Sequence, residues 1–374
     1  MSTLQRQNTR RALLKQGVAA TVTATLLETK LLASSQPRSL VYLFLVGGED
    51  SNNLLVPLDG RLADYQRSRG ELALSPEALL RVTARDTNLE YGFHPALASV
   101  ADLFRLGAAA VVANVGDPRP PDFARSVHSY DRLHFLPDGV AEPAWLADAN
   151  GGRNGASILA RVLTGRAHNP LATPGAYVLN SRVAVHSRTP EIKEEMSVTP
   201  LVGFPDTSIG RHLAIVASRL ASSGGAGEVF TILQGGYDTH LNQLEAQARA
   251  YAELNDAVDA FYGFLTAKGL TQHVTLATAT EFNRTLASNG KGGSEHAWGG
   301  HRLVIGAAAV GGVVHGSLPS YRLGGSDDAT GRGVWRPSMA EAHLDSALGS
   351  WVGYSVSALA AAGLPGVSSL RVVI

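Results

Sequence analysis

Carboxylate and imidazole side chains gather in three short segments between residues 234 and 301 of this chain. The segments read Gln234-Gly-Gly-Tyr-Asp238-Thr-His240, Thr280-Glu281-Phe-Asn-Arg284 and Ser294-Glu295-His296-Ala-Trp-Gly-Gly-His301. The first two follow apolar runs, residues 228–233 and 273–277, that are typical of buried strands. Ligands of open α/β sheets bind outside the carboxyl ends of the strands, so these loops are expected to meet in one crevice. The pattern predicts a hydrolytic metal site.

The metal ligands must be oxygen and nitrogen atoms, because the chain contains no cysteine. The same absence excludes disulfides, a cysteine nucleophile and a cysteine-derived formylglycine. A carboxylate and an imidazole two residues apart, as at Asp238 and His240, can bind one ion. The pattern does not distinguish Zn, Mn, Ca and Fe, nor one divalent ion from two. The candidate ligands in the three segments are Asp238, His240, Glu281, Glu295, His296 and His301, of which Glu295 and His301 could instead lie next to the ligands.

Each segment also has a purely structural explanation. Asp238 or Thr239 could cap the N-terminus of a helix that begins soon afterwards. Glu281 could form an ion pair with Arg284, and the third segment could be a polar loop packed around Trp298. These alternatives stay open at the level of sequence.

Two serines are candidate nucleophiles. Ser51 could be activated by a bound metal, and Ser126 has His128 close to it in the sequence. A metal-activated water would need neither serine. Arg125 or Arg284 could bind an anionic ester through its guanidinium group. The catalytic candidates are therefore Ser51, His128 and Arg284.

The N-terminal segment has the pattern of an export signal. Two arginines at positions 10 and 11 precede a mildly apolar stretch over residues 17–27 and small residues at 33–35, which is typical of a Tat signal. A merely basic N-terminal arm is the alternative. The stretch is too short for a stable membrane span, which needs about 20 apolar residues. We expect residues 1–35 to be a leader, the Tat translocase to be a partner during export, and the mature chain to be periplasmic or extracellular.

Residues 36–374 are expected to form a single α/β domain. The chain has 374 residues, of which 45% are hydrophobic and 17% charged, as in ordinary globular proteins. Its formal net charge is zero, so it lacks the basic surface expected of a nucleic-acid-binding protein. Composition thus indicates a chain with a sizeable core.

Alternating strand and helix patterns indicate a parallel sheet. Residues 244–268 have apolar side chains three and four apart, which predicts a helix that Gly269 ends. With the apolar runs at 228–233 and 273–277 on either side, this is a βαβ unit, and such units imply helices on the faces of a parallel sheet. The other predicted elements are strands over 39–46, 109–114 and 369–374, helices over 95–106, 211–221 and 339–361, and a loop-rich insertion over 117–173.

Several segments in the same order resemble the domain-of-unknown-function family numbered 1501, which is placed in the alkaline phosphatase and sulfatase superfamily. The resemblance extends from Leu45 to about Gly353. Its segments are residues 45–53, 91–97, 235–240, 280–284, 295–301, 310–316 and 331–333. Several such motifs together are more specific than any one of them alone.

The resemblance implies an alkaline-phosphatase-like, doubly wound and mostly parallel sheet flanked by helices, with a metal site at the strand ends. Characterised superfamily members hydrolyse phosphate or sulfate esters, usually with two divalent cations. The resemblance also implies a bridging carboxylate at Asp50 and a metal-binding carboxylate at Glu281. Asp50 could instead stabilise the bend at Gly47 and Gly48.

Three departures from the family pattern affect the functional expectation. Glu295 stands where relatives have Asp, Val127 where they have Ser before His, and Ala144-Trp-Leu replaces a Trp-Gly-Gly-Arg type of segment. Since fold-level analogy does not fix function, two functions are retained. The first is an exported metal-dependent hydrolase of anionic esters, phosphate or sulfate, including sulfated glycans. The alternative is a non-catalytic periplasmic binding or assembly protein that keeps the fold.

Overall fold

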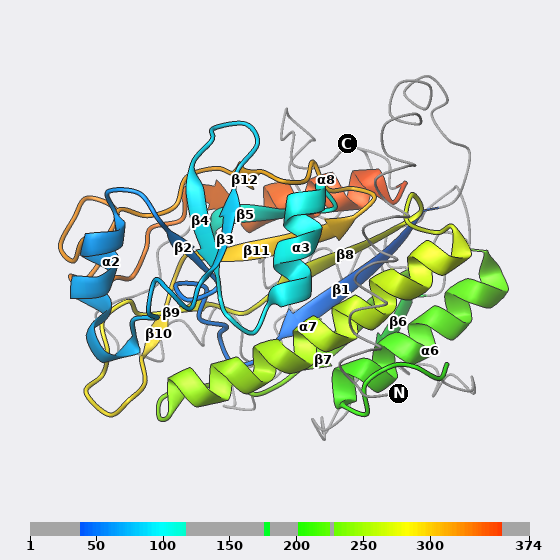
Figure 1. Ribbon diagram of the computed structural model, residues 1–374, viewed down its shortest axis with the longest axis horizontal. Coiled ribbons are helices and arrows are strands. Elements are labelled where there is room, and N and C mark those ends of the chain that lie inside the picture. Colours follow the sequence, from blue (N-terminus) through cyan, green and yellow to red (C-terminus); the bar gives the residue numbers. More distant parts are fainter. Residues whose placement is uncertain (1–37, 117–175, 180–200, 225–227, 354–374) are drawn as a thin grey trace, which may run out of the picture. The chain divides into compact units, whose positions relative to one another are not determined.

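An eight-stranded sheet organises the residues that the computed structural model describes, which are 38–116, 176–179, 201–224 and 228–353 (Figure 1). The strand order is β12-β5-β11-β8-β1-β7-β6, and β13 also pairs with β5. The strands are β1 (Ser39–Leu45), β5 (Ala109–Gly116), β6 (Ala176–Leu179), β7 (Val229–Gln234), β8 (Val274–Ala279), β11 (Gly300–Gly306), β12 (Val314–His315) and β13 (Met339–Ala340).

The sheet is mostly parallel, as predicted. The strands β1, β7 and β8 at its centre run in the same direction, and β6, β5, β12 and β13 share that direction. In the described part of this sheet β11 is the one antiparallel strand, paired with β8 on one side and β5 on the other. Residues 300–306 were not predicted as a strand.

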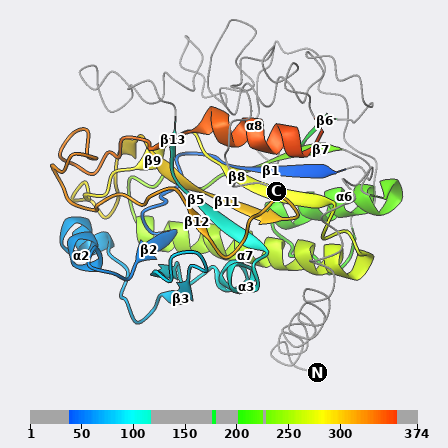
Figure 2. The same cartoon turned by 90° about the horizontal axis from the view of Figure 1, so that it is seen from above.

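Helices cover both faces of the sheet, which confirms the predicted fold class. In Figure 2, α8 (Glu341–Trp351) lies on one face, and α3 (Ala98–Leu106), α6 (Ser208–Ser223) and α7 (Gln243–Lys268) lie on the other. Leu344, Leu348 and Trp351 of α8 belong to one buried cluster with Leu40, Tyr42 and Phe44 of β1. Successive side chains of a strand point to opposite faces, so Val41 and Leu43 are buried on the side of α6 and α7.

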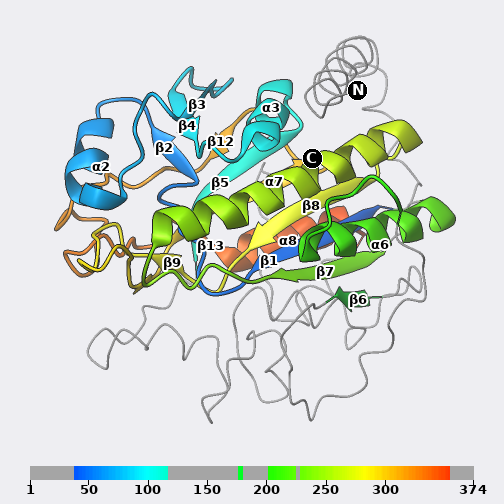
Figure 3. The same ribbon diagram turned by 60° about the horizontal axis from the view of Figure 1, so that its bottom comes forward.

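The predicted βαβ unit consists of β7, α7 and β8, with β1 paired between the two strands. Figure 3 shows α7 running along the sheet beside α6. The buried side of α7 includes Tyr251, Leu254, Val258, Phe261 and Leu265, at the predicted spacing. The helix ends where predicted, because Gly269 adopts a left-handed conformation and caps the last turn.

Residues 55–93 form elements that the sequence did not predict. The strands β2 (Leu55–Pro57), β3 (Leu80–Thr83) and β4 (Glu90–Phe93) make a separate antiparallel sheet, accompanied by α2 (Leu62–Arg69) and the short η2 (Gly70–Leu72). A two-stranded ribbon of β9 (Asn283–Arg284) and β10 (His296–Ala297) lies between β8 and β11 in the chain. These short strands position the loops of the site described below.

Several predictions concern residues outside the described ranges. They are the leader over 1–35, the insertion over 117–173 with Ser126 and His128, the strand over 369–374, and the part of the last helix beyond residue 353. The described residues all fall in one compact unit that begins at Arg38. None of the helices in the described ranges has the length and apolar character needed to cross a lipid bilayer.

A buried glutamate joins α7 to the loop that follows β1. The Glu49 side chain is 2% exposed, and one of its oxygens accepts a hydrogen bond from the Tyr251 hydroxyl. The Glu49 N–H donates to Thr280 Oγ1 at 2.9 Å. Burial raises the pKa of Glu49 from 4.5 to about 8, and the bond from Tyr251 only partly opposes this effect.

The raised pKa gives Glu49 a defined contribution to the pH dependence of stability. The folded chain keeps the Glu49 proton up to about pH 8, whereas the unfolded chain releases it near pH 4.5. The free energy of unfolding therefore falls as pH rises through this window, by at most about 1.4 kcal/mol per pH unit for this group. In a Glu49→Gln variant, the free energy of unfolding should fall less steeply between pH 4.5 and about pH 8. Urea denaturation at several pH values in this range would measure the difference.

The matched control is Glu253→Gln, which changes an exposed glutamate on the same helix as Tyr251. This control should keep the wild-type slope, because its side chain is solvated in both the folded and unfolded states. A Glu49→Gln variant whose stability falls with pH as steeply as that of the wild type would contradict the assignment.

Candidate metal centre

Four loops of the site meet at one edge of the central sheet. The strands β1, β7 and β8 are parallel, so the loops that follow Leu45, Gln234 and Ala279 leave the sheet at the same edge. Because β11 is antiparallel to β8, it is the beginning of β11, at Gly300, that lies at this edge. The segment that precedes β11, with Glu295 and His296, therefore joins the loops that follow the parallel strands.

Three of the predicted ligands come together there. Nε2 of His240 lies 3.0 Å from Oδ1 of Asp238 and 3.1 Å from Nε2 of His296. The third separation, between His296 Nε2 and Asp238 Oδ1, is 3.4 Å. Two atoms that each lie roughly 2.0–2.2 Å from one ion are at most about 4.4 Å apart. All three separations meet this limit, so the donor set fits a single metal ion.

Two of the three donors, Asp238 and His240, are open to solvent, and the third, His296, is buried. The Asp238 side chain is 63% exposed and that of His240 is 38% exposed, whereas His296 is 9% exposed. The Phe282 ring stacks on the His296 ring with centroids 4.1 Å apart. On the other side, Gly47 adopts a left-handed conformation, and a Cβ there would come within 2.5 Å of the Asp238 backbone nitrogen. A glycine is thus required for this close approach.

An ion pair with Arg284 holds the Asp238 carboxylate in place. Its guanidinium group is fully buried, and the Asp238 carboxylate is its ion-pair partner, where the sequence had suggested Glu281. The partners of its nitrogens are Gly48 O at 3.1 Å, Ser294 O at 3.0 Å, Gly47 O at 2.5 Å, Asp238 Oδ1 at 2.5 Å and His240 Nε2 at 3.4 Å. A hydrogen bond with His296 and the Arg284 charge hold the pKa of Asp238 well below its usual range, although burial opposes them.

Four of the five N–H groups of Arg284 thus donate to protein oxygens, and His240 Nε2 lies near the fifth. This placement does not favour a role for Arg284 in binding substrate directly, which stays a prediction. The same geometry rejects the capping alternative for Asp238 and Thr239, because the N-cap residue of α7 is Asn242.

Glu281 lies beside the group and holds the glycine turn. Its carboxylate accepts hydrogen bonds from the Gly47 N–H at 3.0 Å and the Gly48 N–H at 3.2 Å. Burial raises the pKa of Glu281, and these backbone bonds only partly compensate. The structure therefore places Glu281 near the site without adding it to the three donors.

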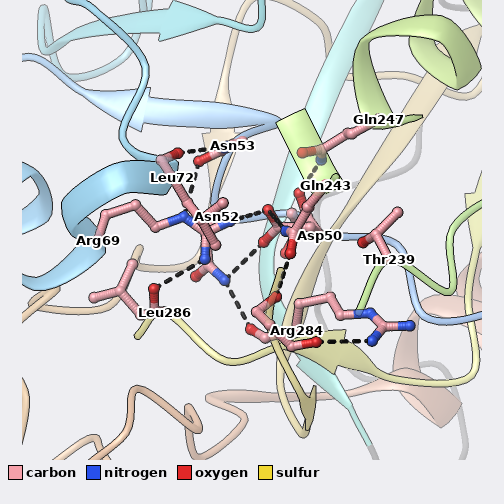
Figure 4. Close-up of polar contacts among 12 residues, drawn as sticks. Asp50, Asn52, Asn53, Arg69, Leu72, Thr239, Gln243, Gln247, Arg284 and Leu286 are labelled. Atoms are coloured by element: carbon pink, nitrogen blue, oxygen red, sulfur yellow. Dashed lines mark hydrogen bonds and ion pairs between the residues drawn. The ribbon is translucent and has the colours of Figure 1, made fainter. Parts of the chain in front are cut away.

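Asp50 lies in a separate buried network, drawn in Figure 4. One carboxylate oxygen forms an ion pair with Arg69 and accepts a 2.6 Å hydrogen bond from Gln243 Nε2. The other oxygen accepts from Asn52 Nδ2 at 2.9 Å. Asp50 is 1% exposed, and the network occupies both of its oxygens. The role of Asp50 as a metal ligand stays a prediction, and the partners of its two oxygens do not favour it.

Ser51 and His301 are hydrogen-bonded to each other in the interior. The fully buried Ser51 hydroxyl donates to Asn283 Oδ1 at 3.1 Å and accepts from the His301 N–H at 2.9 Å. Nδ1 of His301 accepts from the Asn114 N–H at 3.0 Å, and its Nε2 lies 3.4 Å from the Tyr321 hydroxyl. Burial lowers the pKa of His301 to about 3. Neither side chain contributes to the three-donor group, so their predicted roles also stay predictions.

The Glu295 carboxylate contacts His240, one of the three donors. Its Oε2 lies 3.1 Å from Nδ1 of His240, and its Oε1 accepts from Asn289 Nδ2 at 3.0 Å. Burial would raise the pKa of Glu295, but the Asn289 bond and the nearby histidines lower it overall.

Sequence reasoning missed the polar side chains that hold the loops, namely Arg69, Gln243, Asn283 and Asn289. Gln243 and Gln247 are buried one turn apart on α7, on the side that carries its apolar residues. Polar residues on an apolar helix face were the available signal, since buried polar groups are nearly always hydrogen-bonded. Arg69 ends α2, Asn283 lies in the two-residue strand β9 and Asn289 lies in a loop, and the sequence pattern predicted none of these segments as a helix or strand.

The solved structures that match this chain are distant from it in both sequence and structure. The C-terminal periplasmic domain of EcEptC from Escherichia coli, in complex with Zn, is 9% identical with a TM-score of 0.39, covering 86% of this chain and 84% of that chain. A protein of Bacteroides thetaiotaomicron from a core genetic locus for the metabolism of multiple glycosaminoglycans is 10% identical, with a TM-score of 0.36 and coverages of 85% and 73%. A protein in the alkaline phosphatase superfamily from Vibrio parahaemolyticus is 12% identical, with a TM-score of 0.33 and coverages of 92% and 75%. Such similarity identifies neither a substrate nor a reaction.

The search of curated proteins found no match. A family model does match the middle of the chain, and it spans the three segments that carry Asp238, Glu281 and His296. Its description is "Protein of unknown function (DUF1501)". Residues 183–330 thus match the DUF1501 family, which confirms the resemblance seen in the sequence motifs.

Proposed function

We propose that this chain is an exported metal-dependent hydrolase of anionic esters, with one divalent ion held by Asp238, His240 and His296. The observation that carries the proposal is the mutual approach of one carboxylate oxygen and two imidazole nitrogens at a solvent-exposed strand edge. The arginine pair and apolar stretch of residues 1–35 support export by the Tat route. Phosphate and sulfate esters, on small molecules or glycans, are the proposed substrates.

The charge of a bound divalent ion would favour an anionic substrate, because such an ion is often the largest local charge in a site. The Arg284 guanidinium offsets the charge of Asp238, and Asp238 and His240 are exposed, so an anionic ester could approach the ion from the solvent.

Three protein ligands are the usual number in catalytic zinc sites, where a further position stays open to water or substrate. The chemistry that a bound divalent ion supplies is polarisation of an ester oxygen and a lower pKa for an attacking water. The residues of the chain have positioning roles: Arg284 holds Asp238, and Phe282 packs against His296. Ser51 is buried with its hydroxyl already hydrogen-bonded, so the proposal uses water as the nucleophile.

Metal content is the first test. The folded mature chain, purified without chelators, should contain about one equivalent of a divalent ion by elemental mass spectrometry. Asp238→Asn and His296→Ala should lose most of it, because each removes one of three donors. The controls are Asp206→Asn, whose side chain is 95% exposed, and His343→Ala on α8. A persistent absence of metal after reconstitution, or full metal content in both site variants, would count against the proposal.

Hydrolysis is the second test. The metal-loaded chain should hydrolyse chromogenic phosphate or sulfate esters, with activity that chelation abolishes and re-addition of the ion restores. Asp238→Asn should lower kcat/KM by roughly a thousandfold or more, since a catalytic ion contributes several kcal/mol. A chain that binds the ion but hydrolyses neither ester class would favour the alternative, a non-catalytic periplasmic binding or assembly protein.

A further inference from the structure

The two ring nitrogens of His240 have different partners. Nε2 is directed at the other two donors, 3.0 Å from Asp238 and 3.1 Å from His296. Nδ1 lies on the opposite side of the ring, 3.1 Å from Glu295 Oε2. A metal ligand needs its lone pair on the nitrogen that faces the ion, so the partner of the other nitrogen decides whether His240 can bind.

Glu295 favours the tautomer that a ligand needs. Its carboxylate can only accept a hydrogen bond, so it holds a hydrogen on His240 Nδ1. Nε2 faces the Asp238 carboxylate at 3.0 Å and Arg284 Nη1 at 3.4 Å, so these two neighbours have opposite effects on its hydrogen. With the hydrogen on Nδ1, the lone pair of the neutral ring is on Nε2, the nitrogen at which an ion would bind.

Glu295 is itself fixed by Asn289. Nδ2 of Asn289 donates to Glu295 Oε1 at 3.0 Å and to the backbone oxygen of His240 at 2.9 Å. Asn289 Oδ1 accepts from the Lys291 N–H at 2.9 Å, which holds the Asn289 side chain in its loop. One amide group therefore ties the backbone of His240 to the carboxylate that contacts its ring.

The loop that carries Asn289 and Glu295 lies directly against the His240 loop. A Cβ at Gly293 would come within 2.2 Å of the His240 carbonyl carbon and oxygen. The Ser294 N–H donates to Thr239 O at 3.3 Å, and the Gln243 N–H donates to Gly292 O at 2.9 Å. The two loops form one packed unit, so the position of Glu295 relative to His240 is set by the backbone.

We propose that Glu295 is a positioning residue, which orients His240 through Nδ1 and is not itself a ligand. Its two oxygens are engaged, one by His240 and the other by Asn289. Carboxylates that accept from the second nitrogen of a metal-bound histidine fix the ring and raise its basicity. This inference rests on the proposed metal site, and it chooses between the two roles, ligand or neighbour of a ligand, that the sequence left open for Glu295.

The test compares metal affinity and ligand set in the full mature chain, using Zn²⁺ titration and Co²⁺ absorption spectra. Glu295→Ala should weaken Zn²⁺ binding by about 10–100-fold, while the Co²⁺ spectrum keeps the wild-type band positions and intensity. Asn289→Ala should weaken binding in the same direction, and the loss in the double variant should be smaller than the product of the two single losses, because Asn289 acts in part through Glu295. Glu245→Ala, an exposed carboxylate on α7, is the matched control and should leave the affinity unchanged.

The hydrogen on His240 Nδ1 in the Zn²⁺-loaded chain provides a readout that a general loss of stability would not move, because Nδ1 lies 3.1 Å from Glu295 Oε2. Long-range ¹H–¹⁵N NMR spectra should show this hydrogen as a slowly exchanging, low-field resonance in the wild type, and Glu295→Ala should lose that resonance. An altered Co²⁺ spectrum in Glu295→Ala, like that of Asp238→Asn, would instead make Glu295 a ligand and overturn the inference. Unchanged affinity in Glu295→Ala, with Asp238→Asn impaired, would overturn the inference alone. No binding by the wild type would overturn the proposed function as well.

Discussion

The buried guanidinium of Arg284 is the constraint on which the arrangement of the site depends. A buried charge without partners is strongly destabilising, so each of its N–H groups must meet an acceptor. The acceptors come from the turn after β1, the loop after β7 and the segment before β10. The hydrogen bonds of this one guanidinium group therefore require three loops to lie close together. Asp238 is the carboxylate that balances its charge.

Strand direction explains how the third loop reaches the same place. Parallel strands bring only the segments that follow them to the carboxyl edge, which accounts for Asp238 and Glu281. His296 precedes its strand, and it reaches this edge because β11 runs antiparallel to β8. The ribbon of β9 and β10 places His296 opposite Arg284, so the histidine and the arginine that fixes Asp238 lie side by side.

Periodicity predicted the elements whose faces are buried in a regular way, such as β1, α7 and β8. It also predicted that Asp238 and His240 would lie at the carboxyl edge of the sheet, because they follow a predicted strand. His296 was a candidate ligand by residue type, but its position depends on β11, which was not predicted as a strand. The roles of Asp50 and Glu281 could not be read in the same way. Both follow strands, yet their partners are Arg69 and the Gly47 and Gly48 amides, and such tertiary contacts have no signature in spacing. The small sheet over residues 55–93 was missed because strands of three or four residues are too short to show alternation.

The carboxylates at this edge divide into two kinds, and the division argues for one ion rather than two. Asp50 and Glu281 are buried, and their oxygens accept from Arg69, Gln243 and backbone amides that hold the loops. Binding a second ion there would require breaking these bonds and leaving the Arg69 guanidinium unpaired in the interior, which is costly. Asp238 is the carboxylate that is 63% exposed while also being fixed from below by Arg284. Among the described residues, Asp238, His240 and His296 are the one group of carboxylates and histidines whose donor atoms lie close enough to share an ion, and its carboxylate is both anchored and open to solvent, which favours the proposal of a single ion.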